Sequence, residues 1–426
     1  MLIEFRVSNF RSFNEEQVLS LVAARRDTKH SGSLIPCEGF DLLKSAVIYG
    51  ANAAGKSNLI KALGTMRTIV CDSEKGWTQG DPIPDVSPFR LGLETTDKPT
   101  KFEVVLLLDD AYFAYGFCAT RARVHDEFLR VRPLGAKKEQ TWFRRTLDVG
   151  KKTTSWNFAG LFAKETKSQR DILEKTRDNC LLLSYAAHHN VACSNNLFLW
   201  FKNGLRVFDL SDKPSSLLGE TLVKAKENEV FLDRAKELLR DADFGIHDID
   251  FEYHKLDVEP QEWARKPVLP SVIKTLHRVE GSDDIAFNML ADESLGTQRF
   301  FALTGPFLDV LEKGAVVVVD ELECSMHPLM TRKLIELFQS PEQNKKGAQL
   351  IFATHDVSLM DPYLFRRDQI WLVEKRQSGA SVLFSLYDFE PEERPRNTEA
   401  FRKNYLAGRY GGVPSFGAFF ENLEGK

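Results

Sequence analysis

The sequence predicts an α/β fold with a parallel sheet, and three observations lead to this prediction. A short apolar run at 46–49 enters a glycine-rich loop, after which residues 57–69 have helical periodicity. Two further apolar runs, at 315–319 and 349–353, each end in acidic or histidine side chains. Apolar runs of this length are typical of strands buried on both faces, as in a parallel sheet covered by helices.

An antiparallel β-section is expected near the N-terminus. Residues 2–8 alternate apolar and polar side chains, which is the pattern of a half-buried strand. Residues 101–120 predict a hairpin with Asp109 and Asp110 at the turn. Between these segments, residues 71–100 are rich in Gly, Pro, Asp and Thr and are expected to form a loop.

The chain divides into three expected parts: an N-terminal lobe at 1–125, an insertion or arm at 126–285, and a C-terminal lobe at 286–426. Helical spacing over 216–241 predicts that the insertion is mainly helical, and the absence of sustained heptads argues against a long coiled coil. Another helix is expected from Leu295. The insertion would then separate two halves of one sheet.

Composition restricts the classes of function. The net charge of −4 over 426 residues gives no overall electrostatic case for binding nucleic acid or an acidic membrane. The six cysteines form no C-x-x-C pair, which argues against zinc and suits a reducing cytosol. No apolar stretch reaches about 18 residues, and the N-terminus has a strand pattern rather than that of a signal peptide. We therefore expect a cytoplasmic protein that does not enter membranes.

The glycine-rich loop at 50–57 matches the pattern G-x-x-x-x-G-K-[ST] of phosphate-binding loops. Glycine allows several backbone amides to approach phosphate oxygens at once, and the following helix points its N-terminus at the negative charge. By chance the pattern occurs in on the order of one chain in fifty of this length, but its place between a strand and a helix favours ATP binding. The residues expected to bind ATP are Gly50, Asn52, Ala54, Gly55, Lys56, Ser57 and Asn58.

Two acids follow the strand at 315–319. Asp320 lies at the carboxyl end of that strand, where ligands of open α/β sheets gather, and is expected to hold Mg²⁺ together with Ser57. Glu321 is expected to orient or deprotonate the attacking water. Alone, two acids here could mark a simple exit from a strand into a loop. Beside a phosphate loop, the functional interpretation is favoured.

His355 follows the strand at 349–353 and is expected at the same sheet edge as Asp320 and Lys56. An imidazole there could contact the γ phosphate of ATP and act with Glu321 in catalysis. A single His at a strand end is more often structural. Its alignment with the other two strand ends favours a role in the site.

The segment Ser294-Leu295-Gly296-Thr297-Gln298 precedes the expected helix and is the fourth motif. A Ser and a Gly at a helix start expose amides and a hydroxyl that can bind phosphate. In isolation the segment would be an ordinary helix N-cap. Its position shortly before the strand that ends at Asp320 favours the phosphate interpretation.

In this order, the four motifs resemble those of the ATP-binding-cassette (ABC) ATPases. The segment 8–13, Ser-Asn-Phe-Arg-Ser-Phe, and the phosphate loop are similar to those of RecF and the structural-maintenance-of-chromosomes (SMC) class. The segment 320–328 is also similar to that of the OLD (overcoming lysogenization defect) ATPases. Further segments resemble the bacterial ATPase family of abortive-infection and phage-defence operons, such as RloA and AbiL, and these lie at 88–91, 200–201, 368–374 and 405–414.

This resemblance implies an ABC-type ATPase head that forms a homodimer or a higher homo-oligomer on ATP. Ser294, Gly296 and Gln298 of one subunit would then meet the γ phosphate held by Lys56 of the other. It also implies slow, regulatory hydrolysis of ATP with Mg²⁺, and control of a separately encoded effector, a nuclease or toxin, in anti-phage defence. Arg11 and Ser12 match positions near which this class holds the nucleotide.

The sequence departs from these families at two points. ABC proteins usually have a Gln that contacts Mg²⁺, but Gln79 lies in a context that does not match, so this contact has no assigned residue. OLD proteins have a C-terminal nuclease domain, whereas only about 70 residues follow His355, without a convincing acidic metal-binding pattern. We therefore expect any nuclease to be a partner protein.

The alternative function is a RecF-like DNA-binding repair ATPase. Between Arg121 and Lys152 the chain has ten basic and four acidic residues. Such a segment could bind nucleic-acid phosphates, or it could be the solvated face of a hairpin, which is the more common case. A transporter ATPase is disfavoured because the chain has no apolar spans.

Overall fold

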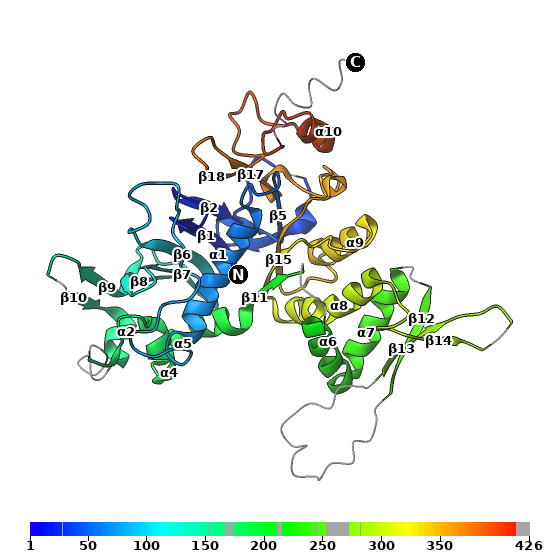
Figure 1. The fold of residues 1–426 in the computed structure, drawn as a ribbon, viewed down its shortest axis with the longest axis horizontal. Coiled ribbons are helices and arrows are strands. Elements are labelled where there is room, and N and C mark those ends of the chain that lie inside the picture. The colour runs from blue at the N-terminus through cyan, green and yellow to red at the C-terminus, as the bar shows by residue number, and fades with distance from the viewer. Residues whose placement is uncertain are drawn as a thin grey trace, which may run out of the picture.

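The computed structural model describes residues 1–414 apart from 28, 152, 167–171, 173, 211–214, 243–244, 253–271 and 282. Two large sheets lie on either side of one long helix, α1 (Lys56–Asp72), and further helices cover the outer face of the parallel sheet (Figure 1). The elements of the N-terminal sheet are β1 (Leu2–Ser8), β2 (Gln17–Ser20), β6 (Thr100–Leu108), β7 (Ala111–Ala119), β8 (Val124–Pro133), β9 (Gln140–Asp148) and β10 (Thr153–Phe158).

The N-terminal sheet is antiparallel throughout, with the strand order β10-β9-β8-β7-β6-β1-β2. β6 and β7 form the predicted hairpin, and Asp109 and Asp110 make its turn. The predicted loop follows the end of α1 and extends to the start of β6. A small separate hairpin consists of β3 (Leu34–Cys37) and β4 (Phe40–Leu43).

The second sheet has six strands in the order β11-β15-β16-β5-β17-β18, and all but β18 are parallel. Every residue of β5, β15 and β16 is buried, as continuous apolar runs predict for a covered parallel sheet. Its strands are β5 (Ser45–Tyr49), β11 (Leu205–Asp209), β15 (Val316–Asp320), β16 (Gln349–Ala353), β17 (Ile370–Lys375) and β18 (Ser381–Ser385).

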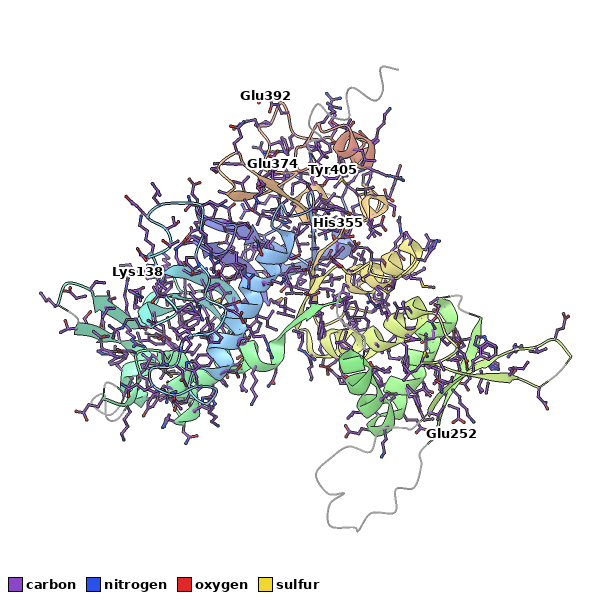
Figure 2. The ribbon with its side chains drawn as sticks, in the orientation of Figure 1. Lys138, Glu252, His355, Glu374, Glu392 and Tyr405 are labelled. Atoms are coloured by element: carbon purple, nitrogen blue, oxygen red, sulfur yellow. The ribbon has the colours of Figure 1, made fainter. Side chains whose placement is uncertain are left out.

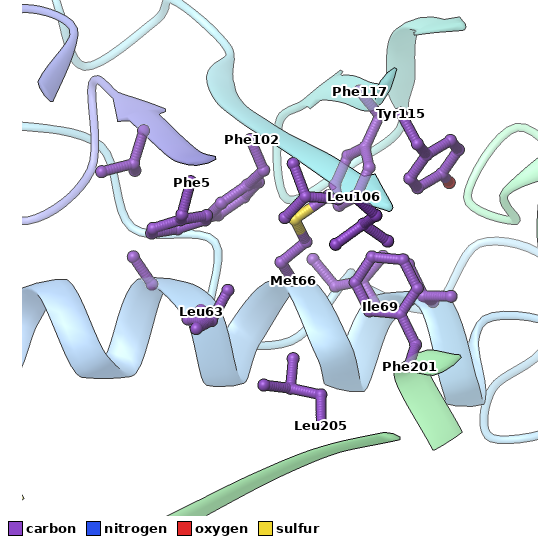
Figure 3. Packing of buried hydrophobic residues seen from close by; sticks show 14 of the residues in the cluster. Phe5, Leu63, Met66, Ile69, Phe102, Leu106, Tyr115, Phe117, Phe201 and Leu205 are labelled. Atoms are coloured by element: carbon purple, nitrogen blue, oxygen red, sulfur yellow. The ribbon is translucent and has the colours of Figure 1, made fainter. Parts of the chain in front are cut away.

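Helix α1 lies between the two sheets because its apolar side chains point to both. Leu63, Met66 and Ile69 pack among Phe5, Phe102 and Leu106 of the antiparallel sheet, with Leu205 of β11 close to the helix (Figure 3). All of these side chains are buried. The phosphate loop joins the end of β5 to the start of α1 and therefore lies at the carboxyl edge of the parallel sheet.

The opposite face of the parallel sheet is covered by a second apolar core. The long helix α8 begins at Leu295, as predicted, and its middle is buried over three consecutive turns. The helices and strands on this side are α6 (Ser215–Glu227), α7 (Glu229–Asp241), β12 (Ile246–Glu252), β13 (Val272–His277), β14 (Ile285–Asn288), α8 (Leu295–Lys313) and α9 (Pro328–Gln339). The remaining elements are α2 (Gly160–Glu165), α4 (Leu182–His188), α5 (Ala192–Leu199), α10 (Phe401–Leu406), the π-helical turn η2 (Trp200–Gly204) and the 3₁₀ turns η1 (Ser31–Ser33), η4 (Val357–Leu359) and η5 (Arg367–Gln369).

The middle of the chain corrects the expectation of a mainly helical insertion at 126–285. The boundary at 125/126 falls inside β8, and β8–β10 continue the N-terminal sheet to residue 158. In β8 the buried Leu129 and Val131 alternate with basic side chains, which is the period of a strand and not of a helix. In addition, β11 joins the parallel sheet beside β15. Within the described residues, the helices of this segment lie between 160 and 241.

No helix in the described part of the chain is both long and apolar enough to cross a bilayer.

Candidate nucleotide-binding site

The predicted site residues meet at the carboxyl edge of the parallel sheet. β16 lies between β5 and β15, with Ala353 opposite Ile48 and Phe352 opposite Val319. The segments that follow these three strands therefore leave the sheet side by side. They are the phosphate loop, the acidic segment from Asp320, and the segment that contains His355.

Both glycines of the phosphate loop are required by close packing. A Cβ atom on Gly55 would lie 2.6 Å from Ser381 Oγ and 2.8 Å from Ser12 Oγ, and one on Gly50 would collide with the carbonyl oxygen of Val373. Both residues also have positive φ angles, 122° at Gly55 and 155° at Gly50. Side chains at these positions would push the loop away from the sheet edge, so glycine is needed for the loop's shape.

Lys56 is buried and folds back over its own loop. Its Nζ donates hydrogen bonds to the carbonyl oxygens of Gly50, at 2.9 Å, and Ala51, at 3.2 Å. Burial lowers the pKa of Lys56, and the nearby carboxylates of Asp320, Glu323 and Glu321 oppose that shift. A cation held only by carbonyl oxygens is available to exchange those partners for phosphate oxygens.

Asp320 is a buried carboxylate with an incomplete set of partners. Its side chain is hydrogen-bonded to Ser57, but Oδ1 is buried without a hydrogen-bond partner. Burial raises the pKa of Asp320, and the charges of Asp209 and Glu321 add to the rise. A buried carboxylate oxygen without a hydrogen-bond partner raises the free energy of the folded state, and a cation bound there would lower it again. The hydroxyl of Ser57 and this oxygen are hard donors of the kind that Mg²⁺ prefers.

Glu323, two residues after Glu321, contacts the segment of His355 and was not singled out from the sequence. Glu323 accepts the backbone N–H of His355 at 2.6 Å through Oε1, and its Oε2 is buried without a partner. Glu323 therefore joins the acidic segment to the segment after β16. Glu321 has a left-handed backbone, with φ of 56°, which costs about 1 kcal/mol in a residue other than glycine. The imidazole of His355 is exposed at this edge (Figure 2).

Ser12 supports the phosphate loop through side-chain hydrogen bonds. Its Oγ accepts a hydrogen bond from Asn58 Nδ2 at 2.8 Å, and its carbonyl accepts the N–H of Ser381 at 2.7 Å. The Ser381 hydroxyl in turn donates to the carbonyl of Ala54. No local pattern in the sequence points to Ser381, because it lies in β18, more than 300 residues after the loop that it contacts.

Arg11 lies on another side of the loop. Its backbone N–H donates to the carbonyl oxygen of Ser87 at 2.7 Å. Arg11 and Asp320 both line a cavity of about 310 Å³. In the phosphate loop itself, the side chain of Asn52 is exposed and that of Ala54 is buried.

The fourth motif forms the N-terminus of α8. Ser294 is its N-cap, with Oγ accepting the N–H of Thr297 at 3.1 Å, so the ordinary capping role is present. Gly296 lies against the segment after Asp320, since a Cβ there would be 2.6 Å from the carbonyl oxygen of Ser325. Gln298 donates to the carbonyl of Glu293 at 3.0 Å. Ser294 is exposed, and contact with the phosphate of a second subunit stays a prediction.

A family model described as "AAA domain, putative AbiEii toxin, Type IV TA system" matches residues 45–361. The matched span is well over half of the chain and includes the phosphate loop, Ser294, Asp320 and His355. The chain belongs to this AAA-domain family. Its mixed parallel and antiparallel sheets around a phosphate-loop helix confirm the expected ABC-like P-loop ATPase fold class. Nucleotide binding, typically with Mg²⁺, is what this family implies.

Two solved structures are similar to the chain at low sequence identity. One is the Smc head domain with an extended coiled coil bound to the C-terminal domain of ScpA, from Pyrococcus furiosus. It is 12% identical, and the match covers 90% of this chain and 96% of that one with a TM-score of 0.39. The other is the recombination mediator RecF of the RecFOR pathway, at 14% identity, 90% and 98% coverage and a TM-score of 0.30. No curated protein matches the chain.

In this AAA-domain protein the basic stretch from Arg121 forms strands, and several of its charges are paired. Arg145 is buried and donates to the carbonyl of Cys180 at 2.7 Å. Arg130 pairs with Glu139 at 2.9 Å and Arg144 with Asp126 at 3.2 Å. Lys138 lies at the surface of this sheet, remote in the molecule from His355 (Figure 2), and Lys152 lies outside the described residues. These pairs favour the interpretation as a solvated hairpin face.

Proposed function

We propose that this AAA-domain protein binds and slowly hydrolyses ATP with Mg²⁺, dimerises on ATP, and thereby controls a separately encoded effector in anti-phage defence. The observation that supports it best is the meeting of Lys56, Asp320 and Glu321 at one sheet edge, with an unpaired Asp320 Oδ1 beside the phosphate loop. A buried cation, a metal-binding carboxylate and a second carboxylate are the groups that phosphoryl transfer to water requires.

Each residue has a distinct task in the proposed reaction. Lys56 exchanges the loop carbonyls for the β and γ phosphate oxygens, and the backbone amides of the loop and of the first turn of α1 bind the same group. Ser57 and Asp320 would hold Mg²⁺, which supplies positive charge to neutralise the phosphates. Glu321 orients the attacking water and accepts its proton. His355 donates a hydrogen bond to the γ phosphate, from a segment that Glu323 holds in place.

Dimerisation would complete the site from a second copy. Ser294 lies at the exposed start of α8, and its neighbour Leu295 is 48% exposed, so this end of the helix is open to another molecule. The first amides of α8 and the Ser294 hydroxyl would bind the γ phosphate held by Lys56 of the partner. Only the triphosphate reaches both subunits, and therefore only ATP favours the closed dimer.

The control of an effector rests on the family and on the resemblance to phage-defence ATPases. The family description places the matched domain in a toxin–antitoxin system, and because such a system has two components, the description supports a partner protein. In this proposal the chain acts as a switch, closed with ATP and open after hydrolysis. The effector would distinguish the two states.

The experiment that tests this proposal compares wild-type protein with the variant Glu321→Gln. The amide cannot accept a proton, so ATP turnover should fall about 100-fold while ATP remains bound and the dimer persists. ATP turnover is measured by phosphate release, and the molar mass of the dimer by light scattering after size exclusion. Glu312→Gln on α8 is the matched control. Normal turnover by Glu321→Gln would show that the catalytic carboxylate is assigned wrongly.

A further inference from the structure

The edge strand β11 brings another carboxylate to the site. In the parallel register of β11 and β15, Asp209 is the partner of Asp320, and the N–H of Leu210 donates to the carbonyl of Asp320 at 3.3 Å. Side chains of directly paired residues in parallel strands project from the same face of the sheet. Asp209 and Asp320 therefore lie side by side where their two strands end.

The two carboxylates share one cavity. Asp209, Asp320, Arg11, Lys61 and Asp85 line the cavity of about 310 Å³ beside α1. Asp209 is exposed, whereas Asp320 is only 4% exposed and has the unpaired Oδ1. The cavity thus combines a buried carboxylate oxygen in need of a partner with a second carboxylate that solvent can reach.

Two carboxylates at paired positions of neighbouring strands repel each other. The cations Arg11 and Lys61 line the same cavity. A divalent cation between the carboxylates would turn this repulsion into attraction.

We propose that Asp209 is a second carboxylate of the Mg²⁺ site and would help to hold the ion beside Ser57 and Asp320. The inference rests on the proposed ATP function, because the ion would arrive with the nucleotide. Mg²⁺ is usually held by one or two carboxylates, waters and substrate phosphates and not by an all-protein cage.

Asp209 is a candidate for the Mg²⁺ contact to which the sequence analysis assigned no residue. The Gln that usually contacts Mg²⁺ in ABC proteins has no residue assigned to it in this chain, and Gln79 lies in the loop after α1. Asp209 instead reaches the site from β11, within the segment that was expected to be a separate insertion. The end of β11 therefore joins the segment 126–285 directly to the site.

The test measures Mg²⁺ dependence of nucleotide binding, not turnover. Wild type, Asp209→Ala and Asp209→Asn are titrated with Mg²⁺ at fixed fluorescent ATP analogue, and binding of the analogue is also measured in EDTA. Asp85→Asn is the matched control, since Asp85 lines the same cavity from a loop away from the strand ends. Circular dichroism shows that each variant is folded.

Both Asp209 variants should need about 10-fold more Mg²⁺ for half-maximal binding, as removal of outer-shell metal partners commonly causes. Their affinity in EDTA should equal or exceed that of wild type, because a negative charge near the phosphates is gone. The Asp85 variant should behave as wild type. An unchanged Mg²⁺ midpoint in the Asp209 variants, or an equal shift in Asp85→Asn, would overturn the assignment of Asp209 alone. Failure of the wild-type protein to bind nucleotide would overturn the proposed function as well.

Discussion

The phosphate loop and the start of α8 represent two contrasting halves of the proposed site. The loop is held from several sides, by Ser12 and Ser381 from distant parts of the chain and by the buried Lys56 side chain, which donates to two of the loop's carbonyl oxygens. The start of α8 is exposed, and the contacts of Ser294 and Gln298 lie within their own segment.

This difference indicates that the loop and the start of α8 have different roles in binding ATP. The loop is shaped in advance, so binding of the phosphates to it requires little reorganisation, whereas the start of α8 offers amides and a hydroxyl to whatever approaches. We infer that a single chain suffices to bind ATP and that a second chain is needed to complete the site. The predictions below test the two halves separately.

The largest effect is expected in the loop half. Lys56→Ala should weaken ATP binding by at least about 100-fold, because a buried cation that contacts two phosphates is lost. Lys75→Ala, just beyond the end of α1 and exposed, should bind as wild type. Isothermal titration with ATP and Mg²⁺ measures both. Equal affinities of the two variants would contradict the role of Lys56.

The α8 half is tested by Ser294→Asp. Aspartate is as good an N-cap as serine, so the melting temperature should change by less than about 1 °C. Its negative charge should nevertheless repel a γ phosphate presented by a partner and weaken ATP-dependent dimerisation about 10-fold. Sedimentation of the variant in the Glu321→Gln background checks this. An unchanged dimer would mean that Ser294 is a cap and nothing more.

A smaller effect should follow from loss of the support behind the loop. Ser381→Ala removes the hydrogen bond to Ala54 without touching the nucleotide, at a cost of about 1 kcal/mol, which corresponds to a roughly fivefold loss of ATP affinity if the loop is bound only in its ordered form. Ser378→Ala, exposed in the turn before β18, is the control. Identical ATP affinities would show that the loop keeps its shape unaided.

Asp320 should make the nucleotide-free protein less stable at neutral pH. Its pKa is raised in the fold, mainly by burial, so the folded state binds the proton more tightly than the unfolded chain does. The destabilisation is absent below the unfolded pKa and grows as pH rises through the folded pKa. Asp320→Asn should therefore melt about 1–3 °C higher than wild type at pH 8, with a smaller gain at acid pH. Calorimetry showing the opposite trend would contradict the unpaired carboxylate.

The smallest effect is expected far from both halves, in the basic stretch. Arg144→Glu with Lys151→Glu should leave duplex-DNA binding unchanged within error, because Arg144 is already paired with Asp126 and Lys151 lies near Asp148. Filter binding at low salt measures this. A large, salt-dependent loss would favour the repair ATPase instead.

The sequence predicted those parts of the molecule that depend on local pattern. The phosphate loop, the strands ending at Asp320 and before His355, and the start of α8 follow from apolar runs and neighbouring polar residues, and all are present. The roles of Glu323 and Ser381 could not be predicted, because they depend on contacts between distant strands. Asp209 was missed for the same reason: nothing in a short strand shows that it pairs with β15. The boundary at 125/126 was wrong because a hairpin in the basic stretch was expected only as an alternative and not as a continuation of the N-terminal sheet.

The most direct test of a composite site is to mix two impaired variants. Lys56→Ala retains the start of α8, and Ser294→Asp retains the phosphate loop. In a mixed dimer, one of the two sites combines an intact loop from one chain with an intact α8 from the other. At a protein concentration where each variant alone turns over ATP far more slowly than wild type, the account predicts that mixing them restores a substantial fraction of wild-type turnover. A mixture no more active than the sum of its components would contradict the central claim that two chains share each site.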